Sequence, residues 1–208
     1  AQKEAVEEEL GEGLELFPTY QRHYPGGASA CHIVGYVGKK ARLPTGPVAS
    51  GEPLWPITEG REGIEVTFDG QLQGTLGSIN YLFDADGLKL GEEIVRQPLP
   101  GKNVVTAIDS RMQVLAEKAL SDFTDRGAFV VMDVHSGDIY AMASRPTYDI
   151  NTWIPAISIA EFKALQEDPD LPLFPRSFRG QYPPASTFKV SVALAALEGG
   201  VVDGTTLV

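Results

Sequence analysis

The segment that most restricts how this 208-residue chain can fold lies near its C-terminal end. From Val190 to Leu197 the sequence reads VSVALAAL, so the helix that it predicts is apolar on nearly every face. A helix of this pattern is typical of a protein interior, where other elements cover it all round. The segment therefore predicts a globular fold with a buried helix, which ends at Gly199-Gly200.

Two residues one turn earlier have the chemistry of a nucleophile and a base. Ser186 and Lys189 are spaced i and i+3, so both side chains project from the same side of the helix. A lysine that enters a core loses hydration, and this favours the neutral amine. A neutral amine can accept the serine proton while the serine attacks a carbonyl. The N–H groups at the helix N-terminus can stabilise the resulting oxyanion.

The Ser-x-x-Lys pattern alone leaves two interpretations open. In the first, Pro183 and Pro184 stiffen the start of the helix and hold Ser186 in a fixed place for nucleophilic catalysis. In the second, Ser186 only caps the helix, and Lys189 is a surface residue whose stem lies along apolar neighbours. A pattern this short recurs by chance, so the spacing by itself does not decide between them.

Turn signals divide the chain near residue 100, and the first part is predicted to be β-rich. Short alternating runs predict strands at HIVGYVG (32–38) and GIEVTF (63–68). Asp86-Gly87 joins YLFD to LKL and predicts a hairpin.

The second part combines strands and helices, so the chain as a whole is predicted to be α+β. NVVTAI (103–108) predicts a strand, and Asp109 or Ser110 caps a helix with one apolar face. That face consists of Met112, Leu115, Ala116, Ala119 and Leu120. AFVVMDV and DIYAMAS, separated by His135-Ser136-Gly137, predict a hairpin of two well-buried strands. Ser158 and Glu161 form a capping box that opens a helix over SIAEFKALQED, which stops before Pro169.

Charge and cysteine content limit the partners and cofactors to expect. The chain has 28 acidic against 17 basic residues, a net charge of −11, and six glutamates fall within the first fifteen residues. A surface this acidic repels phosphate backbones, so nucleic acid is not an expected partner. Cys31 is the single cysteine and is expected to be a small buried hydrophobe. No disulfide, metal site or cofactor is predicted, and no apolar run reaches the ~20 residues that span a bilayer.

Several longer stretches carry a family resemblance. They are YPPASTFK (182–189) with the following ALEGGVVDGTT, GAFVVMDVHSGDIYAMASRPTYDIN (127–151), GKNVVTAIDSRMQVLAEKAL (101–120), HYPGGASACHIVGYVG (23–38) and GREGIEVTFDGQLQGTLGS (60–78). The first three resemble, in turn, the active-serine segment, the paired strands, and the first strand and helix of class B penicillin-binding proteins. The last two resemble the non-catalytic pedestal of the same family. Within that family the elongation-specific type is the most similar.

The resemblance implies a fold, an activity and a site. Residues 1–100 would be part of a pedestal, or dimerisation-like, module. Residues 101–208 would be the N-terminal part of a transpeptidase domain with a serine β-lactamase-like fold. By resemblance, Ser186 would attack the penultimate D-alanine carbonyl of a peptidoglycan stem peptide, with Lys189 as base. β-Lactams would trap Ser186 as a stable ester, which makes the implied activity that of a D,D-transpeptidase.

It also implies a location at the periplasmic face of the bacterial inner membrane, with the anchor outside this chain, and partners among cell-wall elongation proteins. The sequence departs from the family pattern in three ways. Ala185 stands where glycine is usual, and PRSF (175–178) replaces a stretch that usually contains Asn-Arg-Ala. The Ser-x-Asn and Lys-Thr-Gly motifs, which follow the active serine in the family, do not occur after Ser186. We therefore expect a fragment that is inactive alone and that self-associates through open strand edges and the apolar helix.

Two other hypotheses remain. PASTFK followed by ALEGG also resembles class D β-lactamases and β-lactam sensor domains, although these have no module comparable to residues 1–100. In the other hypothesis the chain is a non-enzymatic scaffold module, and the serine has no chemical role.

Overall fold

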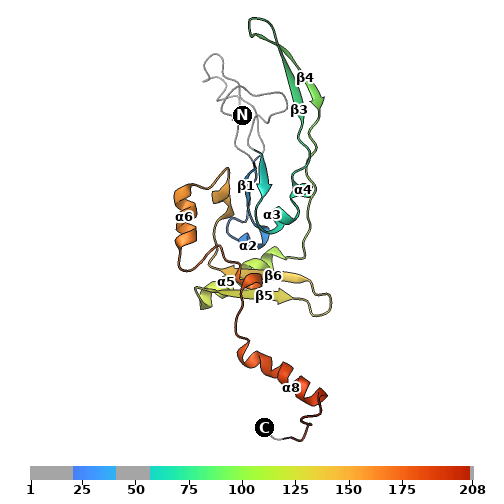
Figure 1. The fold of residues 1–208 in the computed structure, drawn as a ribbon, viewed down its shortest axis with the longest axis vertical. Helices are drawn as coiled ribbons and strands as arrows, with labels where there is room; N and C mark the ends of the chain where they lie inside the picture. The colour runs from blue at the N-terminus through green and yellow to red at the C-terminus, as the bar shows by residue number, and fades with distance from the viewer. Residues whose placement is uncertain (1–20, 41–56, 207–208) are drawn as a thin grey trace.

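The computed structural model describes residues 21–40 and 57–206, which form an elongated molecule (Figure 1). The acidic run in the first fifteen residues lies outside the described residues. The part before residue 100 contains α2 (Cys31–Val34), β1 (Val37–Lys39), β2 (Thr58–Gly60), α3 (Gly63–Thr67), α4 (Asp69–Leu72), β3 (Ser78–Phe83) and β4 (Lys89–Arg96). The part after it contains α5 (Ser110–Phe123), β5 (Gly127–Met132), β6 (Ile139–Arg145), η1 (Ile150–Trp153), α6 (Ile159–Glu167), α7 (Arg176–Arg179), η2 (Ala185–Thr187) and α8 (Phe188–Glu198). This mixture confirms the predicted α+β fold.

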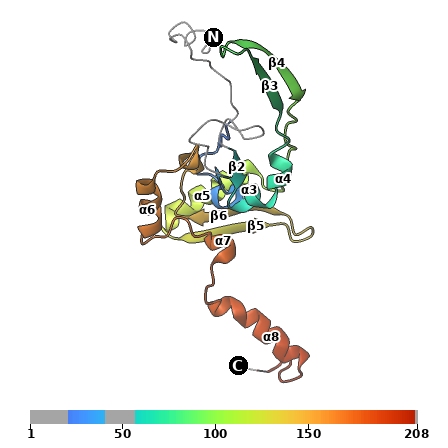
Figure 2. The same ribbon diagram turned by 45° about the horizontal axis from the view of Figure 1, so that its top comes forward.

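The described strands form three antiparallel two-stranded sheets, β1–β2, β3–β4 and β5–β6. The hairpin predicted around Asp86-Gly87 is β3–β4, and Gly87 has a φ of 82° in its turn. This hairpin reaches away from the rest of the molecule (Figure 2). The second predicted hairpin is β5–β6, in which Asp133 accepts hydrogen bonds from the N–H groups of His135 and Ser136. Both hairpin predictions are therefore confirmed.

Two predicted helix starts are also confirmed. Asp109 caps α5 by accepting hydrogen bonds from the N–H groups of Arg111 and Met112. At the start of α6, Ser158 Oγ accepts from the N–H of Glu161, while the Glu161 carboxylate accepts from the N–H of Ser158. Each cap uses groups within four residues of one another, so the local sequence is enough to specify it.

Helix α5 and the β5–β6 hairpin share a small core. Its buried members are Ala116, Leu120, Ala141 and Ala143. The predicted apolar face of α5 is partly wrong, because Met112 and Leu115 are exposed and Gln113 is buried instead. The Gln113 amide exchanges hydrogen bonds with the backbone of Met142. The prediction of two well-buried strands holds for β6 only, because most residues of β5 are exposed, Val130 among them.

A second core is built from residues on both sides of position 100. Its buried members are Tyr24, Cys31, Tyr148, Ile150 and Trp153. Tyr36 stacks on Trp153 with ring centroids 3.6 Å apart. The Asn151 side chain binds the backbone of Tyr24, although the two residues are 127 positions apart in the sequence. It accepts from the Tyr24 N–H at 3.0 Å and donates to the Tyr24 carbonyl at 2.9 Å. Cys31 is a buried free cysteine in this core, as predicted.

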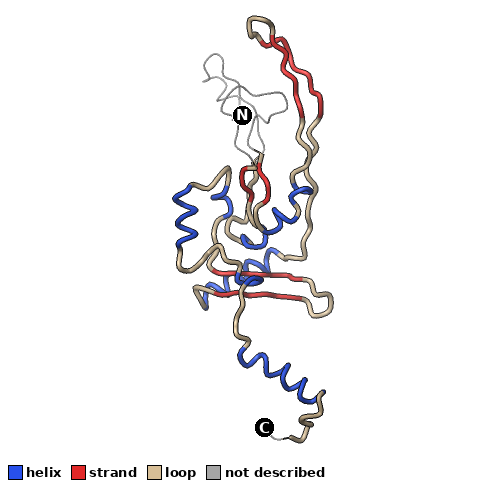
Figure 3. The backbone as a smooth tube through the Cα atoms, viewed as in Figure 1, coloured by secondary structure: helices blue, strands red, loops and turns tan. Residues whose placement is uncertain are grey.

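The strand predicted at residues 63–68 is wrong, because residues 63–67 form helix α3 (Figure 3). The alternating pattern places Glu65 on the polar side, but in the structure Glu65 is only 5% exposed. It pairs with Arg22 at 2.9 Å and accepts a hydrogen bond from the hydroxyl of Tyr24 at 3.0 Å. A buried, fully partnered carboxylate on this segment overrides its strand propensity.

The strand predicted at residues 32–38 is correct only in its last part, because residues 31–34 form helix α2. Gly35 ends this helix with a φ of 75°. Gly63, at the start of α3, has a φ of 59°, and a Cβ there would lie 2.4 Å from the carbonyl oxygen of Ile33. The ends of α2 and α3 therefore approach each other at a distance that only glycine permits.

The strand predicted at NVVTAI (103–108) is also wrong in this structure, because no described strand pairs with it. Val105 in its middle is 92% exposed. The segment reaches β6 only at its end, where the N–H of Asp109 donates to the carbonyl of Tyr140 at 2.9 Å. A strand requires a partner along its edge, and the described residues provide none here.

Candidate active site at the start of helix α8

Ser186 lies in the short 3-10 turn η2, which leads directly into α8. The N–H and the hydroxyl of Thr187 both donate to the carbonyl of Pro184, and the N–H of Phe188 donates to the carbonyls of Ala185 and Ser186. The N-cap of α8 is Thr187, and no described hydrogen bond engages the Ser186 hydroxyl. The structure therefore gives no support to the interpretation of Ser186 as a cap.

The residue before Ser186 has an unusual backbone conformation. Ala185 has a φ of 47°, in the left-handed region that glycine favours. For an L-residue with a Cβ this conformation costs on the order of 1 kcal/mol. The position is the one where alanine replaces the glycine usual in the resembling family. The structure shows that this alanine places a Cβ in a strained turn.

Lys189 is the second residue of α8, three positions after Ser186, so the two residues lie on consecutive helical turns. The predicted burial is wrong, because Ser186, Lys189 and most of α8 are exposed. Val190, for example, is 66% exposed. Helix α8 extends away from the body of the molecule in both ribbon views (Figures 1 and 2). Burial requires neighbouring elements as well as apolar residues, and the described residues do not supply the desolvation expected for Lys189.

The segment in front of η2 is held by contacts of Arg176 and Ser177 that the sequence did not predict. The buried guanidinium of Arg176 donates to the carbonyls of Asp170 and Leu171 at 2.6 and 3.0 Å. The N–H of Ser177 donates to Ser144 Oγ at 2.9 Å, and the two hydroxyls are 2.8 Å apart, which ties α7 to β6. A signal for the role of Arg176 was the Pro-rich run DPDLPLFP before it. Prolines have no N–H, so a Pro-rich run has fewer backbone donors than carbonyls, and a nearby arginine can donate to the carbonyls that remain.

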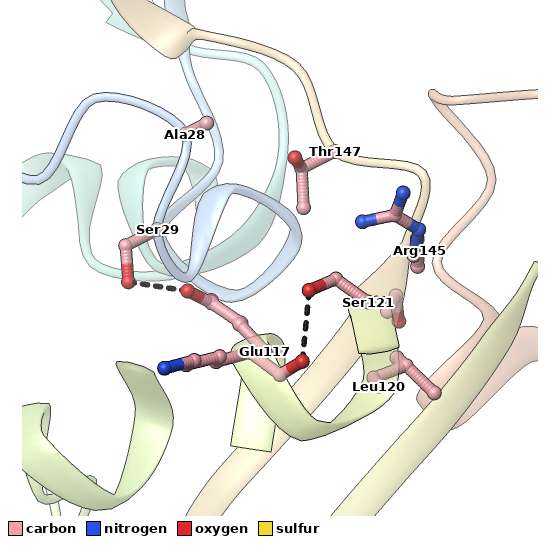
Figure 4. A pocket seen from close by; sticks show the side chains of 9 residues that line it. Ala28, Ser29, Glu117, Leu120, Ser121, Arg145 and Thr147 are labelled. Carbon is pink, nitrogen blue, oxygen red and sulfur yellow. Dashed lines mark hydrogen bonds between the residues drawn. The ribbon is translucent and has the colours of Figure 1, made fainter. Parts of the chain in front are cut away.

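A shallow cleft of about 270 Å3 lies where the loop at Ala28 and Ser29 meets α5 and the end of β6 (Figure 4). On one of its walls, Glu117 accepts hydrogen bonds from Ser29 Oγ at 2.8 Å and from the N–H of Ala30 at 2.7 Å. The cleft contains neither Ser186 nor Lys189. Its side chains instead join the two parts of the chain.

Within residues 21–40 and 57–206, no group of three or more His, Cys, Asp or Glu side chains is placed to hold a metal ion. In the same ranges, no helix is both long enough and apolar enough to cross a membrane.

Comparison with known families agrees with the motifs. Residues 2–106 match the penicillin-binding protein dimerisation domain, and residues 127–208 match the penicillin binding protein transpeptidase domain. The chain therefore belongs to the penicillin-binding protein family, as the resemblance indicated. Ser186 and Lys189 both fall within the transpeptidase match.

Individual relatives specify the type within this family. The peptidoglycan D,D-transpeptidase MrdA of Escherichia coli K12 is 33% identical over 93% of this chain and 31% of its own length. The solved structure of Pseudomonas aeruginosa PBP2 in complex with WCK 5153 is 36% identical, with a TM-score of 0.70 over 92% of this chain and 38% of that one. Helicobacter pylori PBP2 in complex with MreC gives 29% identity and a TM-score of 0.71, over 89% of this chain and 34% of that one.

These relatives confirm the similarity to the elongation-type protein, penicillin-binding protein 2. They give no support to the alternative of a class D β-lactamase or a β-lactam sensor. The chain spans about a third of the length of the curated relatives that it matches.

Proposed function

We propose that the full-length protein is a peptidoglycan D,D-transpeptidase that works through a serine acyl-enzyme, with Ser186 as nucleophile and Lys189 as general base. The observation that carries this proposal is the position of the Ser-x-x-Lys tetrad. It stands at the start of α8 within the transpeptidase match, and the Ser186 hydroxyl is not used in capping. The MrdA relatives carry the name peptidoglycan D,D-transpeptidase.

The proposed reaction has two steps. In the first, Ser186 Oγ attacks the carbonyl carbon of the penultimate D-alanine of a stem peptide, and its proton passes to Lys189 Nζ. The amide C–N bond breaks, the terminal D-alanine leaves with that proton, and an ester to Ser186 remains. In the second step, the amine of a neighbouring stem attacks the ester, forms a new amide and returns the proton to Ser186. Lys189 accepts the proton only when neutral, so the reaction requires α8 to be covered by residues beyond those described.

The wider setting is part of the same proposal. Residues 1–100 form part of the pedestal, and residues 101–208 form the N-terminal part of the transpeptidase domain. The solved complex of Helicobacter pylori PBP2 with MreC supports partners among cell-wall elongation proteins. The substrate supports a location at the periplasmic face of the bacterial inner membrane, with an anchor outside this chain. β-Lactams are expected as covalent inhibitors of Ser186.

Covalent labelling of the complete gene product with a fluorescent penicillin tests the nucleophile. We expect one label per wild-type molecule and none on Ser186→Ala. Ser158→Ala, which removes a serine from the capping box of α6, is the matched control and should label normally. Labelling of the Ser186→Ala protein would show that another residue is the nucleophile, and rapid nitrocefin turnover by the wild type would favour a β-lactamase.

The polypeptide of residues 1–208 on its own is proposed to be inactive and to self-associate. Its helix α8 exposes Val190, Val192 and Leu194, and β5 has an open edge. Apolar surface and open strand edges of this kind favour contact between copies. Gel filtration with light scattering should show oligomers, and penicillin labelling should be negligible. A stable monomer that labels stoichiometrically would contradict this proposal.

A further inference from the structure

His32 connects the first part of the chain to the segment that precedes the candidate nucleophile. Its imidazole is 8% exposed, and Nε2 lies 2.7 Å from the carbonyl oxygen of Pro172, which is 140 positions further along the chain. On its other side, Nδ1 lies 3.4 Å from Sγ of Cys31. The ring of Tyr148 meets the imidazole edge-on, with centroids 5.4 Å apart. The ring is therefore held by both of its nitrogens and by one of its sides.

The partners of His32 determine which nitrogen carries the hydrogen. A carbonyl oxygen can only accept, so Nε2 donates to Pro172. Nδ1 then accepts from the thiol of Cys31, which keeps its proton because burial raises its pKa to about 11. Burial lowers the pKa of His32 itself, so the imidazole is neutral. Both hydrogen bonds thus require this one tautomer.

The Pro172 carbonyl lies within a segment whose other hydrogen bonds are also made on its buried side. Arg176 holds the carbonyls of Asp170 and Leu171, and Ser177 is bonded to Ser144 of β6. Among the described residues, His32 makes the buried polar contact from the first part of the chain to the interior side of this segment, and Leu173 also packs against the core that contains Tyr24 and Cys31. An exposed ion pair of Arg179 with Glu62, at 3.5 Å, is a weaker second link. A buried hydrogen bond to a carbonyl that no other described group engages is the more costly one to lose.

The same segment carries η2. Between Arg179 and Pro184, the structure describes no hydrogen bond that holds the chain, and Pro183 and Pro184 stiffen its last step. Five residues join α7 to η2, and the last two, Pro183 and Pro184, restrict the backbone just before Ser186. A nucleophile displaced by about 1 Å can lose on the order of 10²-fold in rate, because the reacting atoms leave the attack geometry.

We propose that His32 is a positioning residue for Ser186, which acts by holding the Pro172 carbonyl and with it the segment that leads to η2. This inference rests on the proposed function, since Ser186 must be the nucleophile for its position to affect a rate. His32 does not touch the substrate in this mechanism. Its role is to let the first part of the chain determine where the serine hydroxyl stands.

Two substitutions separate the hydrogen bond from the packing of the ring. His32→Phe keeps an aromatic ring against Tyr148 and removes the donor to Pro172. His32→Gln places an amide N–H close to the position of Nε2 and keeps that donor. In the complete gene product, we expect His32→Phe to slow acylation by a fluorescent penicillin on the order of 10-fold, while His32→Gln stays within about 2-fold of wild type. The loss should appear in the first-order acylation step and leave the dissociation constant of the initial complex unchanged.

Ser158→Ala is the control for stability alone, since it weakens the start of α6, where the printed side-chain contacts of Ser158 are with Glu161 and not with His32 or Pro172. It should lower the melting temperature without slowing acylation. If folded His32→Phe acylates at the wild-type rate, or if His32→Gln is as slow as His32→Phe, the inference is wrong. If His32→Phe does not fold, His32→Asn replaces it, because its amide is one methylene too short to reach Pro172. Equal rates for Asn and Gln would then overturn the inference.

The two proposals can fail separately. If the wild type labels, Ser186→Ala does not label, and His32→Phe labels as fast as wild type, only the positioning role is lost. If Ser186→Ala still labels, the assignment of the nucleophile is lost first, and the positioning role is lost with it.

Discussion

The core around Tyr148 and the helix that carries Ser186 both consist largely of apolar residues, yet only the first is buried. The core draws Tyr24 and Cys31 from the first part of the chain and Ile150 and Trp153 from the second, so the described residues close it on all sides. Helix α8 has the more apolar sequence and remains exposed. The comparison shows that this chain completes the junction between its two parts by itself, whereas its candidate site depends on contacts that the described residues do not make.

The largest expected effect concerns the base on α8. In the complete gene product, Lys189→Ala should slow penicillin acylation by about 10²–10⁴-fold, because general-base assistance to Ser186 is lost. Lys189→Arg should be similarly slow, since a guanidinium keeps its charge and cannot accept the proton. Rapid-mixing kinetics of fluorescent labelling measures both. A near-normal rate for Lys189→Arg would mean that the positive charge matters and the base does not.

A second prediction contrasts the two regions by stability. Ile150 is 1% exposed in the core, so Ile150→Ala should cost about 2–5 kcal/mol in the polypeptide of residues 1–208. Val190 is 66% exposed on α8, so Val190→Ala should change stability by no more than about 0.5 kcal/mol. Urea unfolding at low protein concentration measures both values. A cost well above 1 kcal/mol for Val190→Ala would show that α8 is covered in solution by another copy.

A third prediction uses pH to change the protonation of His32, which contacts Pro172 across the two parts of the chain. Burial lowers the pKa of His32 in the folded state, the nearby Arg176 lowers it further, and the Pro172 carbonyl and Glu117 oppose the shift. The unfolded chain therefore takes up the proton first as the pH falls through about 6.5, and folded stability decreases. Above about pH 7 His32 is neutral in both states and contributes no pH dependence. The melting temperature should fall between pH 7.5 and 5.5 by more in wild type than in His32→Gln, and equal falls would contradict the prediction.

The smallest expected effect is at the turn before Ser186. Ala185→Gly should stabilise the protein by up to about 1 kcal/mol, because glycine removes the Cβ from a turn with positive φ. Ala195→Gly, the same substitution within α8, should destabilise by about 1 kcal/mol and serves as the control. Denaturant midpoints compare the two. A loss of stability in Ala185→Gly would show that the turn is not strained in solution.

Local chemistry explains which elements could be predicted from the sequence. Asp109, Ser158 with Glu161, and Asp86-Gly87 each specify a cap or a turn through groups only a few residues apart. The spacing of Ser186 and Lys189 at the start of a helix made them candidates, and the resemblance to class B penicillin-binding proteins implied their roles. Predictions of this kind need no information about distant parts of the chain.

The errors arose where a distant partner decides the outcome. Residues 63–67 are helical because Glu65 turns inward to Arg22 and Tyr24. The sequence around Glu65 does not indicate these two partners. The burial of α8 was inferred from its composition, although burial also depends on what surrounds a helix. The contact of His32 with Pro172 was missed for the same reason, since it joins residues 140 positions apart.

That separation has a consequence for synthesis of the protein. A ribosome that adds about 5–20 residues per second needs roughly 7–28 s to progress from His32 to Pro172, given the 140 positions between them. During this interval Tyr24 and Cys31 have emerged without the aromatic residues that later enclose them. The first part of the nascent chain must therefore wait, partly open, for a segment not yet translated. Its vulnerability to proteases and its need for chaperones are greatest before that segment arrives.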